Sequence, residues 1–128
     1  MITSHFILYV SDQERSTRFY STVLGQKPQL HMPGMTEFGL SDTCVLGLMP
    51  EAGIKRLLGD RLPDPAIANG TPRAEVYLRV DDPQAFHQRA IEMGAQELSP
   101  LEKRSWGDIA KYSLDPDGHV LAFAKAAK

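Results

Sequence analysis

The chain has 128 residues, a length typical of one domain, and a formal net charge of -2. Because Lys and Arg are not in excess, the charge argues against a nucleic-acid-binding protein. The single cysteine, Cys44, excludes an intramolecular disulfide and favours a reducing compartment. No apolar run approaches the roughly 20 residues of a membrane span, and the N-terminus does not resemble a signal peptide. We therefore expect a cytoplasmic protein that binds neither nucleic acid nor membranes.

The N-terminal half begins with a strand followed by a helix. Residues 5–12, HFILYVSD, form an apolar run rich in strand-forming side chains that ends in a polar pair. Apolar side chains then recur at helical spacing. Either a capping box of Ser11 with Glu14 or Asp12 alone would begin the helix, and Gly25 is placed to end it.

The second half repeats this unit about 70 residues later, which indicates an internal duplication. Residues 75–81 form a β-rich run. Asp82 can then cap a helix with Pro83 at its first position, and Gly94 is placed to end it.

Each half continues with a hairpin, at residues 36–50 and 108–125. The second hairpin contains Asp-Pro-Asp-Gly at 115–118, which suits a type I turn. One more strand precedes each hairpin, near residues 26–31 and 96–98. The order predicts an α+β fold of two β-α-β-β-β modules.

We expect one domain, 1–128, with modules at approximately 3–50 and 73–125 and a linker at 51–72. The linker segment AGIKRLLG can form one or two helical turns, and the remainder is rich in Pro, Asn and Gly. A linker of this length either lies over a surface or site or is a plain solvated connector.

Alternation along the strands assigns their two faces. The apolar face, expected under the helices, carries Phe6, Leu8, Val10, Leu46, Leu48, Val76, Leu78, Val80, Leu121 and Phe123. The second face is mixed and carries His5, Ile7, Tyr9, Val45, Gly47, Met49, Glu75, Tyr77, Arg79, Val120, Ala122 and Ala124. A sheet with helices on one side and such a face on the other should curl around a ligand or pack on a partner.

The paired modules resemble the vicinal oxygen chelate superfamily, which includes glyoxalases, bleomycin-resistance proteins and extradiol dioxygenases. The matching pieces are HFILYVSDQERSTRFYSTVLG, VYLRVDDPQAFHQRAIEMGA and SWGDIAKYSLDPDGHVLAFA, which cover most of the chain except the linker. The resemblance implies two modules that form a curved, cavity-enclosing mixed sheet, usually in a homodimer.

The resemblance also implies four metal-ligand positions, one on the first and one on the last strand of each module. Here they correspond to His5, Gly47, Glu75 and Ala122, and two of these have no donor atom in the side chain. A catalytic zinc site normally has three protein ligands, so we expect no cofactor.

The alternative is a divalent metal such as Ni, Zn, Mn or Fe on His5 and Glu75. A third ligand would then come from a non-standard position, such as His31, Glu37 or Asp42.

His5 and Glu75 are also the candidate catalytic residues, and each has a structural interpretation. His5 is a ligand or general base, or it is hydrogen-bonded to Glu75 near the start of a strand. Glu75, partly desolvated among apolar neighbours, contacts a ligand or acts as a base. Otherwise it forms a simple ion pair with Arg79 or His5.

Eight residues are candidates for binding an organic ligand. Gly47 and Ala122 would open a groove that admits a larger molecule. Trp106 either stacks on a flat ligand or packs in the fold, and parity leaves the face of Tyr112 open. The full set is Tyr9, Gly47, Met49, Tyr77, Arg79, Trp106, Tyr112 and Ala122.

Three functions follow from these features. The first is a metal-independent, homodimeric binding protein that sequesters a small organic molecule, similar to bleomycin-resistance proteins. The alternative is a divalent-metal-dependent lyase, isomerase or dioxygenase. The third is an interaction module whose sheet face packs on another protein. The apolar sheet edge of each module, which needs cover, favours the homodimer.

Overall fold

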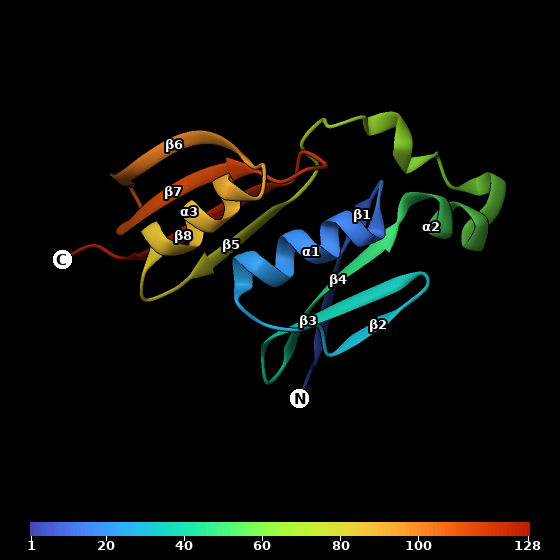
Figure 1. The fold of residues 1–128 in the computed structure, drawn as a ribbon, viewed down its shortest axis with the longest axis horizontal. Coiled ribbons are helices and arrows are strands. Elements are labelled where there is room, and N and C mark those ends of the chain that lie inside the picture. The colour runs from blue at the N-terminus through green and yellow to red at the C-terminus, as the bar shows by residue number, and fades with distance from the viewer. The chain divides into compact units, whose positions relative to one another are not determined.

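The computed structural model describes residues 1–128, and the chain divides into two compact units. Module 1 comprises 1–21 with 25–69, and module 2 comprises 22–24 with 70–128. Each contains a four-stranded mixed sheet, and the chain has three α-helices (Figure 1). The predicted α+β class and the repeated β-α-β-β-β order are confirmed.

Module 1 has the strand order β1-β4-β3-β2, with β1 parallel to β4 and the other pairs antiparallel. Its elements are β1 (Ser4–Val10), α1 (Gln13–Leu24), β2 (Leu30–Met32), β3 (Met35–Ser41) and β4 (Cys44–Pro50).

The linker is more regular than its composition indicates. Helix α2 spans Glu51–Leu58, which contains the predicted helical turns. Two short 3-10 helices follow at Gly59–Arg61 and Pro65–Ala68. None of the helices in the chain is long and apolar enough to cross a lipid bilayer.

Module 2 repeats this topology with the strand order β5-β8-β7-β6, and β5 is parallel to β8. Helix α3 packs against β7 and β8 (Figure 1). The elements are β5 (Glu75–Arg79), α3 (Pro83–Glu92), β6 (Gln96–Lys103), β7 (Asp108–Leu114) and β8 (Val120–Ala126).

Local side-chain chemistry sets the ends of the helices. Asp12, the second of the two predicted caps, accepts a hydrogen bond from the Arg15 backbone N–H. Helix α1 ends at Gly25, whose φ of 67° is the left-handed conformation that glycine adopts without strain. Asp82 caps α3 in the same way, through the N–H of Ala85.

The predicted apolar face is confirmed at its central positions and is wrong at Phe6. Leu8, Leu48 and Phe123 are buried, whereas the side chain of Phe6 is 64% exposed. Val76 on β5 is only half-buried. Phe6 lies near the start of the edge strand β1, whereas Leu8 and Val10, further along the same strand, are buried.

Candidate functional site

The face of module 2 opposite α3 carries a row of three residues at its centre. Tyr77 on β5 pairs with Ala122 on β8, and Ala122 pairs with Tyr112 on β7. Residues paired in register point to the same face of a sheet. Tyr112 therefore shares a face with Tyr77, which answers the question that strand parity left open.

A buried carboxylate, Asp108, organises this face. Arg79 donates from Nε to Asp108 Oδ2 at 3.2 Å and from its terminal NH2 to Oδ1 at 2.8 Å. The Tyr77 hydroxyl donates to Oδ2, and the Trp106 indole N–H donates to the Tyr77 oxygen at 2.8 Å. Asp108 is only 1% exposed. Four side chains from β5, β7 and the turn before β7 therefore form one network, which we call the Asp108 network.

Small residues on β8 make room for this network. Strand β8 lies between β5 and β7, so the side chains cross about two strand spacings, roughly 10 Å. They do so beside Ala122 and Ala124, which are both fully buried. Ala122 therefore does not open a groove as predicted, because the two tyrosines flank it.

The sequence does not single out Asp108, and it predicts Glu75 as the partner of Arg79. Arg79 pairs with Asp108 rather than with Glu75. Glu75 is exposed, so its predicted desolvation is wrong. The one feature of the sequence that points to Asp108 is its position, an acidic residue two places after Trp106 at the start of β7. The sequence does not show which side chains on the other strands lie beside it.

Both tyrosines of the row are hard to ionise. Burial, followed by the hydrogen bond to Asp108, raises the pKa of Tyr77. Burial also raises the pKa of Tyr112, and the negative charge of Glu75 adds to this effect. The Arg104 guanidinium, whose carbon lies 5.0 Å from the centre of the Tyr112 ring, partly opposes the rise. Both hydroxyls therefore stay neutral at physiological pH.

The corresponding face of module 1 is closed over Gly47. A Cβ atom at Gly47 would lie 3.1 Å from Ile7 Cγ1 and 3.4 Å from Met35 Sδ. The predicted groove is therefore absent at Gly47, since neighbouring side chains fill the space above it. Tyr9 and Met49, both half-buried, are paired on β1 and β4.

His5 has a carboxylate partner, but it is Glu37 from β3. His5 Nδ1 lies 3.6 Å from Glu37 Oε2, and Glu37 also accepts a hydrogen bond from Gln29 at 3.1 Å. In the sheet, Glu37 is the β3 partner of Gly47. A carboxylate thus lies one strand away from the position where the family resemblance implies a ligand.

The donor atoms in either module do not fit a catalytic metal ion. Neither module contains a group of three or more His, Cys, Asp or Glu side chains that could hold one, whereas a catalytic site normally supplies three. His5 and Glu37 provide two. His31, another candidate ligand, is already bonded through both ring nitrogens, to Thr36 and Glu14.

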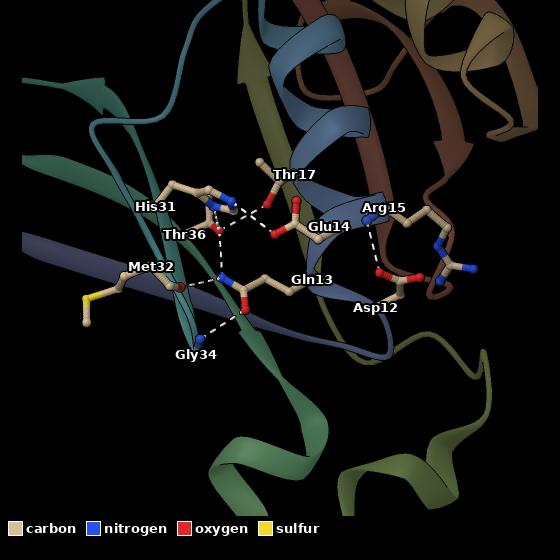
Figure 2. Close-up of polar contacts among 9 residues, drawn as sticks. All are labelled: Asp12, Gln13, Glu14, Arg15, Thr17, His31, Met32, Gly34 and Thr36. Carbon is tan, nitrogen blue, oxygen red and sulfur yellow. Dashed lines mark hydrogen bonds and ion pairs between the residues drawn. The ribbon is translucent and has the colours of Figure 1, made fainter.

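That pair of His31 bonds belongs to a polar cluster between α1 and the β2–β3 hairpin, shown in Figure 2. His31 Nδ1 lies 2.8 Å from the Thr36 hydroxyl, and Nε2 lies 3.1 Å from Glu14 Oε2. The Thr36 hydroxyl also bonds to that of Thr17 at 3.0 Å. Thr36 is fully buried, so its hydroxyl is positioned for packing rather than for attack on a substrate.

Gln13, at the start of α1, completes this cluster (Figure 2). Its amide N–H groups donate to the Met32 carbonyl at 2.8 Å and to the Thr36 hydroxyl at 3.0 Å, and its oxygen accepts from the Gly34 N–H at 3.0 Å. A pocket of about 520 Å³ lies beside it, lined by residues 11–14 and 31–33. The cluster fastens the hairpin to the helix, and no sequence pattern predicted it.

Comparison with known proteins identifies relatives of this fold. A solved glyoxalase-related enzyme from Fulvimarina pelagi has a TM-score of 0.80 at 22% identity, covering 96% of this chain and 86% of that one. A glyoxalase/bleomycin resistance protein/dioxygenase family enzyme from Burkholderia phytofirmans has a TM-score of 0.81 at 14% identity, covering 99% of this chain and all of that one. At these identities the similarity shows the fold alone.

Curated relatives match over a shorter region. Uncharacterised proteins of Mycobacterium bovis and Mycobacterium tuberculosis are 35% identical over 66 residues, which is 52% of this chain. The matched region spans only 43% and 38% of those proteins, respectively. The family model described as "Glyoxalase/Bleomycin resistance protein/Dioxygenase superfamily" matches residues 2–123. The chain therefore belongs to the glyoxalase/bleomycin resistance protein/dioxygenase superfamily.

Proposed function

We propose that this protein binds and sequesters a small organic molecule without a metal ion, using the face of module 2 that the Asp108 network organises. The observation that carries this proposal is Trp106, whose side chain is 56% exposed although its indole N–H is bonded to Tyr77. An exposed aromatic ring held in place by a hydrogen bond loses little entropy when a flat molecule stacks on it.

The neighbouring groups suit a ligand that carries no more than a single charge. The tyrosine hydroxyls are un-ionised at physiological pH, and the Arg79 charge is compensated by Asp108. The face therefore offers hydrogen bonds and π surface without a large net charge. Metal independence is inferred from the donor count, since His5 and Glu37 are two ligands where three are needed.

We also infer a cytoplasmic homodimer as the working form. Phe6 on the edge strand β1 is 64% exposed, and a second copy would cover such a surface. Sedimentation analysis at micromolar concentration should give a dimer mass, and a monomer at every concentration would contradict this part of the proposal.

The test of binding uses Trp106, the only tryptophan of the chain, as its reporter. Screening planar aromatic compounds by Trp106 emission and thermal shift should find a ligand whose affinity is unchanged by EDTA. Trp106→Ala should lower the affinity for that ligand about tenfold, as measured by calorimetry. The matched control, Leu57→Ala, removes another exposed apolar side chain, from helix α2, and should leave the affinity unchanged.

A second function, a divalent-metal-dependent lyase, isomerase or dioxygenase, is favoured by the 3.6 Å contact of His5 with Glu37. Elemental analysis of the purified protein separates the two functions. Near-stoichiometric Ni, Zn, Mn or Fe that is lost in both His5→Ala and Glu37→Gln would establish the metal protein. The absence of bound metal, together with EDTA-insensitive ligand binding, would support the proposed function.

A further inference from the structure

The Asp108 network leaves part of the Arg79 guanidinium free. A guanidinium has five N–H donors in a planar fork. Arg79 donates one N–H from Nε and one from a terminal nitrogen, Nη2, to the two oxygens of Asp108, so the carboxylate contacts the guanidinium side-on. The second terminal nitrogen and the outer N–H of the first have no partner, and the side chain is 64% exposed. One edge of the fork is therefore held by the protein, and the other faces solvent.

Asp108 itself is held rigidly. It accepts hydrogen bonds from Arg79 and Tyr77, and its side chain is only 1% exposed. A buried carboxylate that lost these donors would carry an uncompensated charge, which is strongly unfavourable. The Arg79 fork is therefore fixed in orientation before any ligand arrives, and such preorganisation lowers the entropy cost of binding.

The aromatic surface is tied to the same carboxylate. The indole of Trp106 bonds to the Tyr77 hydroxyl, which bonds to Asp108. The rings of Trp106 and Tyr77 meet edge to face, with centroids 6.4 Å apart. The indole N–H is already used, so Trp106 offers a ligand its ring surface, while the nearby Arg79 offers hydrogen-bond donors.

We infer that Asp108 is a positioning residue that holds Arg79 to receive the carboxylate of a small planar aromatic acid whose ring lies on Trp106. This rests on the proposed function and names its ligand class. A planar carboxylate matches the two parallel N–H groups at the free edge of a guanidinium. Glu75, close enough to raise the pKa of Tyr112, makes a ligand of higher negative charge less favourable on this face.

The test compares two probes of nearly equal shape, naphthalene-2-carboxylate and naphthalene-2-carboxamide, which differ in charge and in the replacement of one acceptor oxygen by a donor NH2 group. Both are titrated into the full chain at neutral pH, and their affinities are measured by calorimetry, because naphthalene absorbs and emits in the same range as Trp106. The carboxylate should bind about tenfold more tightly than the amide or better, because hydrogen bonds to charged groups are the stronger ones. Arg79→Gln should reduce this preference to within about twofold, with amide binding retained.

Asp108→Asn removes the charge that compensates Arg79, which by itself would favour the carboxylate. The preference should nevertheless fall, since the amide cannot accept both guanidinium N–H groups and no longer holds the fork in position. If Asp108 only stabilised the fold, Asp108→Asn would lower the melting temperature and leave the preference for the carboxylate unchanged. Lys125→Gln is the control. It removes an exposed positive charge from the position after Ala124, on the other face of β8, and should leave the preference for the carboxylate unchanged. If Asp108→Asn does not fold, Arg79→Gln decides the carboxylate preference, and Tyr77→Phe, which removes one bond to Asp108, tests the positioning.

Four outcomes would overturn the inference. Equal affinity of the wild-type protein for both probes would refute the carboxylate preference while leaving the binding function in place. A wild-type preference that persists in Asp108→Asn would refute the positioning role. If neither probe binds while the wider screen finds another ligand, the ligand class is wrong, and if the screen also finds nothing, the proposed function fails with it.

Discussion

Arg79 on β5 bonds to Asp108 on β7 across the whole width of β8, with 2.8 Å between the Arg79 terminal nitrogen and Asp108 Oδ1. The contact requires the intervening strand to carry small side chains, and Ala124, which is paired with Arg79, is fully buried at that point. The alanines of β8 therefore have a structural role that is independent of any metal.

Filling this space should break the Asp108 network. In Ala124→Leu the added side chain would collide with the Arg79–Asp108 pair, and we expect a loss of about 1–3 kcal/mol in the free energy of unfolding. Trp106 emission should shift to longer wavelength as Tyr77 releases the indole. Urea unfolding and fluorescence spectra measure both effects. Ala74→Leu, at an exposed position just before β5, is the control and should be nearly neutral; equal effects of the two changes would contradict this account of β8.

Tyr77 should ionise late when the protein is titrated with base. Burial and Asp108 raise its pKa in the folded state above the ordinary value. A group of this kind stabilises the folded state at neutral pH, and the contribution is lost as the pH rises through the raised pKa. Because the pKa of Tyr112 is raised as well, tyrosinate absorbance should show a late phase from both tyrosines, and its amplitude should fall in Tyr77→Phe while the Tyr112 part remains. Trp106 emission should fall in the same pH range, and a late phase of undiminished amplitude in Tyr77→Phe would show that Tyr77 does not ionise late.

Gly118 should be more sensitive to substitution than other glycines with positive φ. It has a φ of 85°, and an added Cβ would lie 2.1 Å from the carbonyl oxygen of Gly70. Gly94→Ala is the control, because Gly94 has a φ of 103° and an added Cβ would have no atom within 4 Å. Its loss in the free energy of unfolding, about 1–2 kcal/mol, measures the backbone strain alone. Gly118→Ala should cost clearly more in urea unfolding. Equal losses in the two variants would mean that the segment at Gly70 moves away without cost.

Thr36 should be the most sensitive member of the cluster between α1 and the hairpin. Thr36→Val keeps the shape of the side chain and removes the hydroxyl that bonds to Gln13, Thr17 and His31. Leaving these groups without a partner should cost about 1–3 kcal/mol, measured by urea unfolding. Thr43→Val, in the exposed turn between β3 and β4, should be neutral. A neutral Thr36→Val would show that water replaces the hydroxyl.

The sequence by itself determined the elements and their repeat, because these depend on short-range physics. Asp12 and Asp82 cap their helices through an N–H three residues away, and Gly25 ends a helix because of its own φ. The alternation of apolar residues correctly placed Leu48 and Phe123 in the core. It failed at Phe6, because alternation assigns a face but does not show how far along β1 that face is covered; Leu8 on the same strand is buried.

Only the tertiary structure decided which side chains meet. Asp108 and Arg79 are 29 positions apart and come together because β5 and β7 lie on either side of β8 in one register. His5 meets Glu37 for the same kind of reason, since β3 and β1 both flank β4. A single chain carries its local preferences in every segment, but the partners of a buried charge depend on strand order and register, which arise only when the whole sheet has formed.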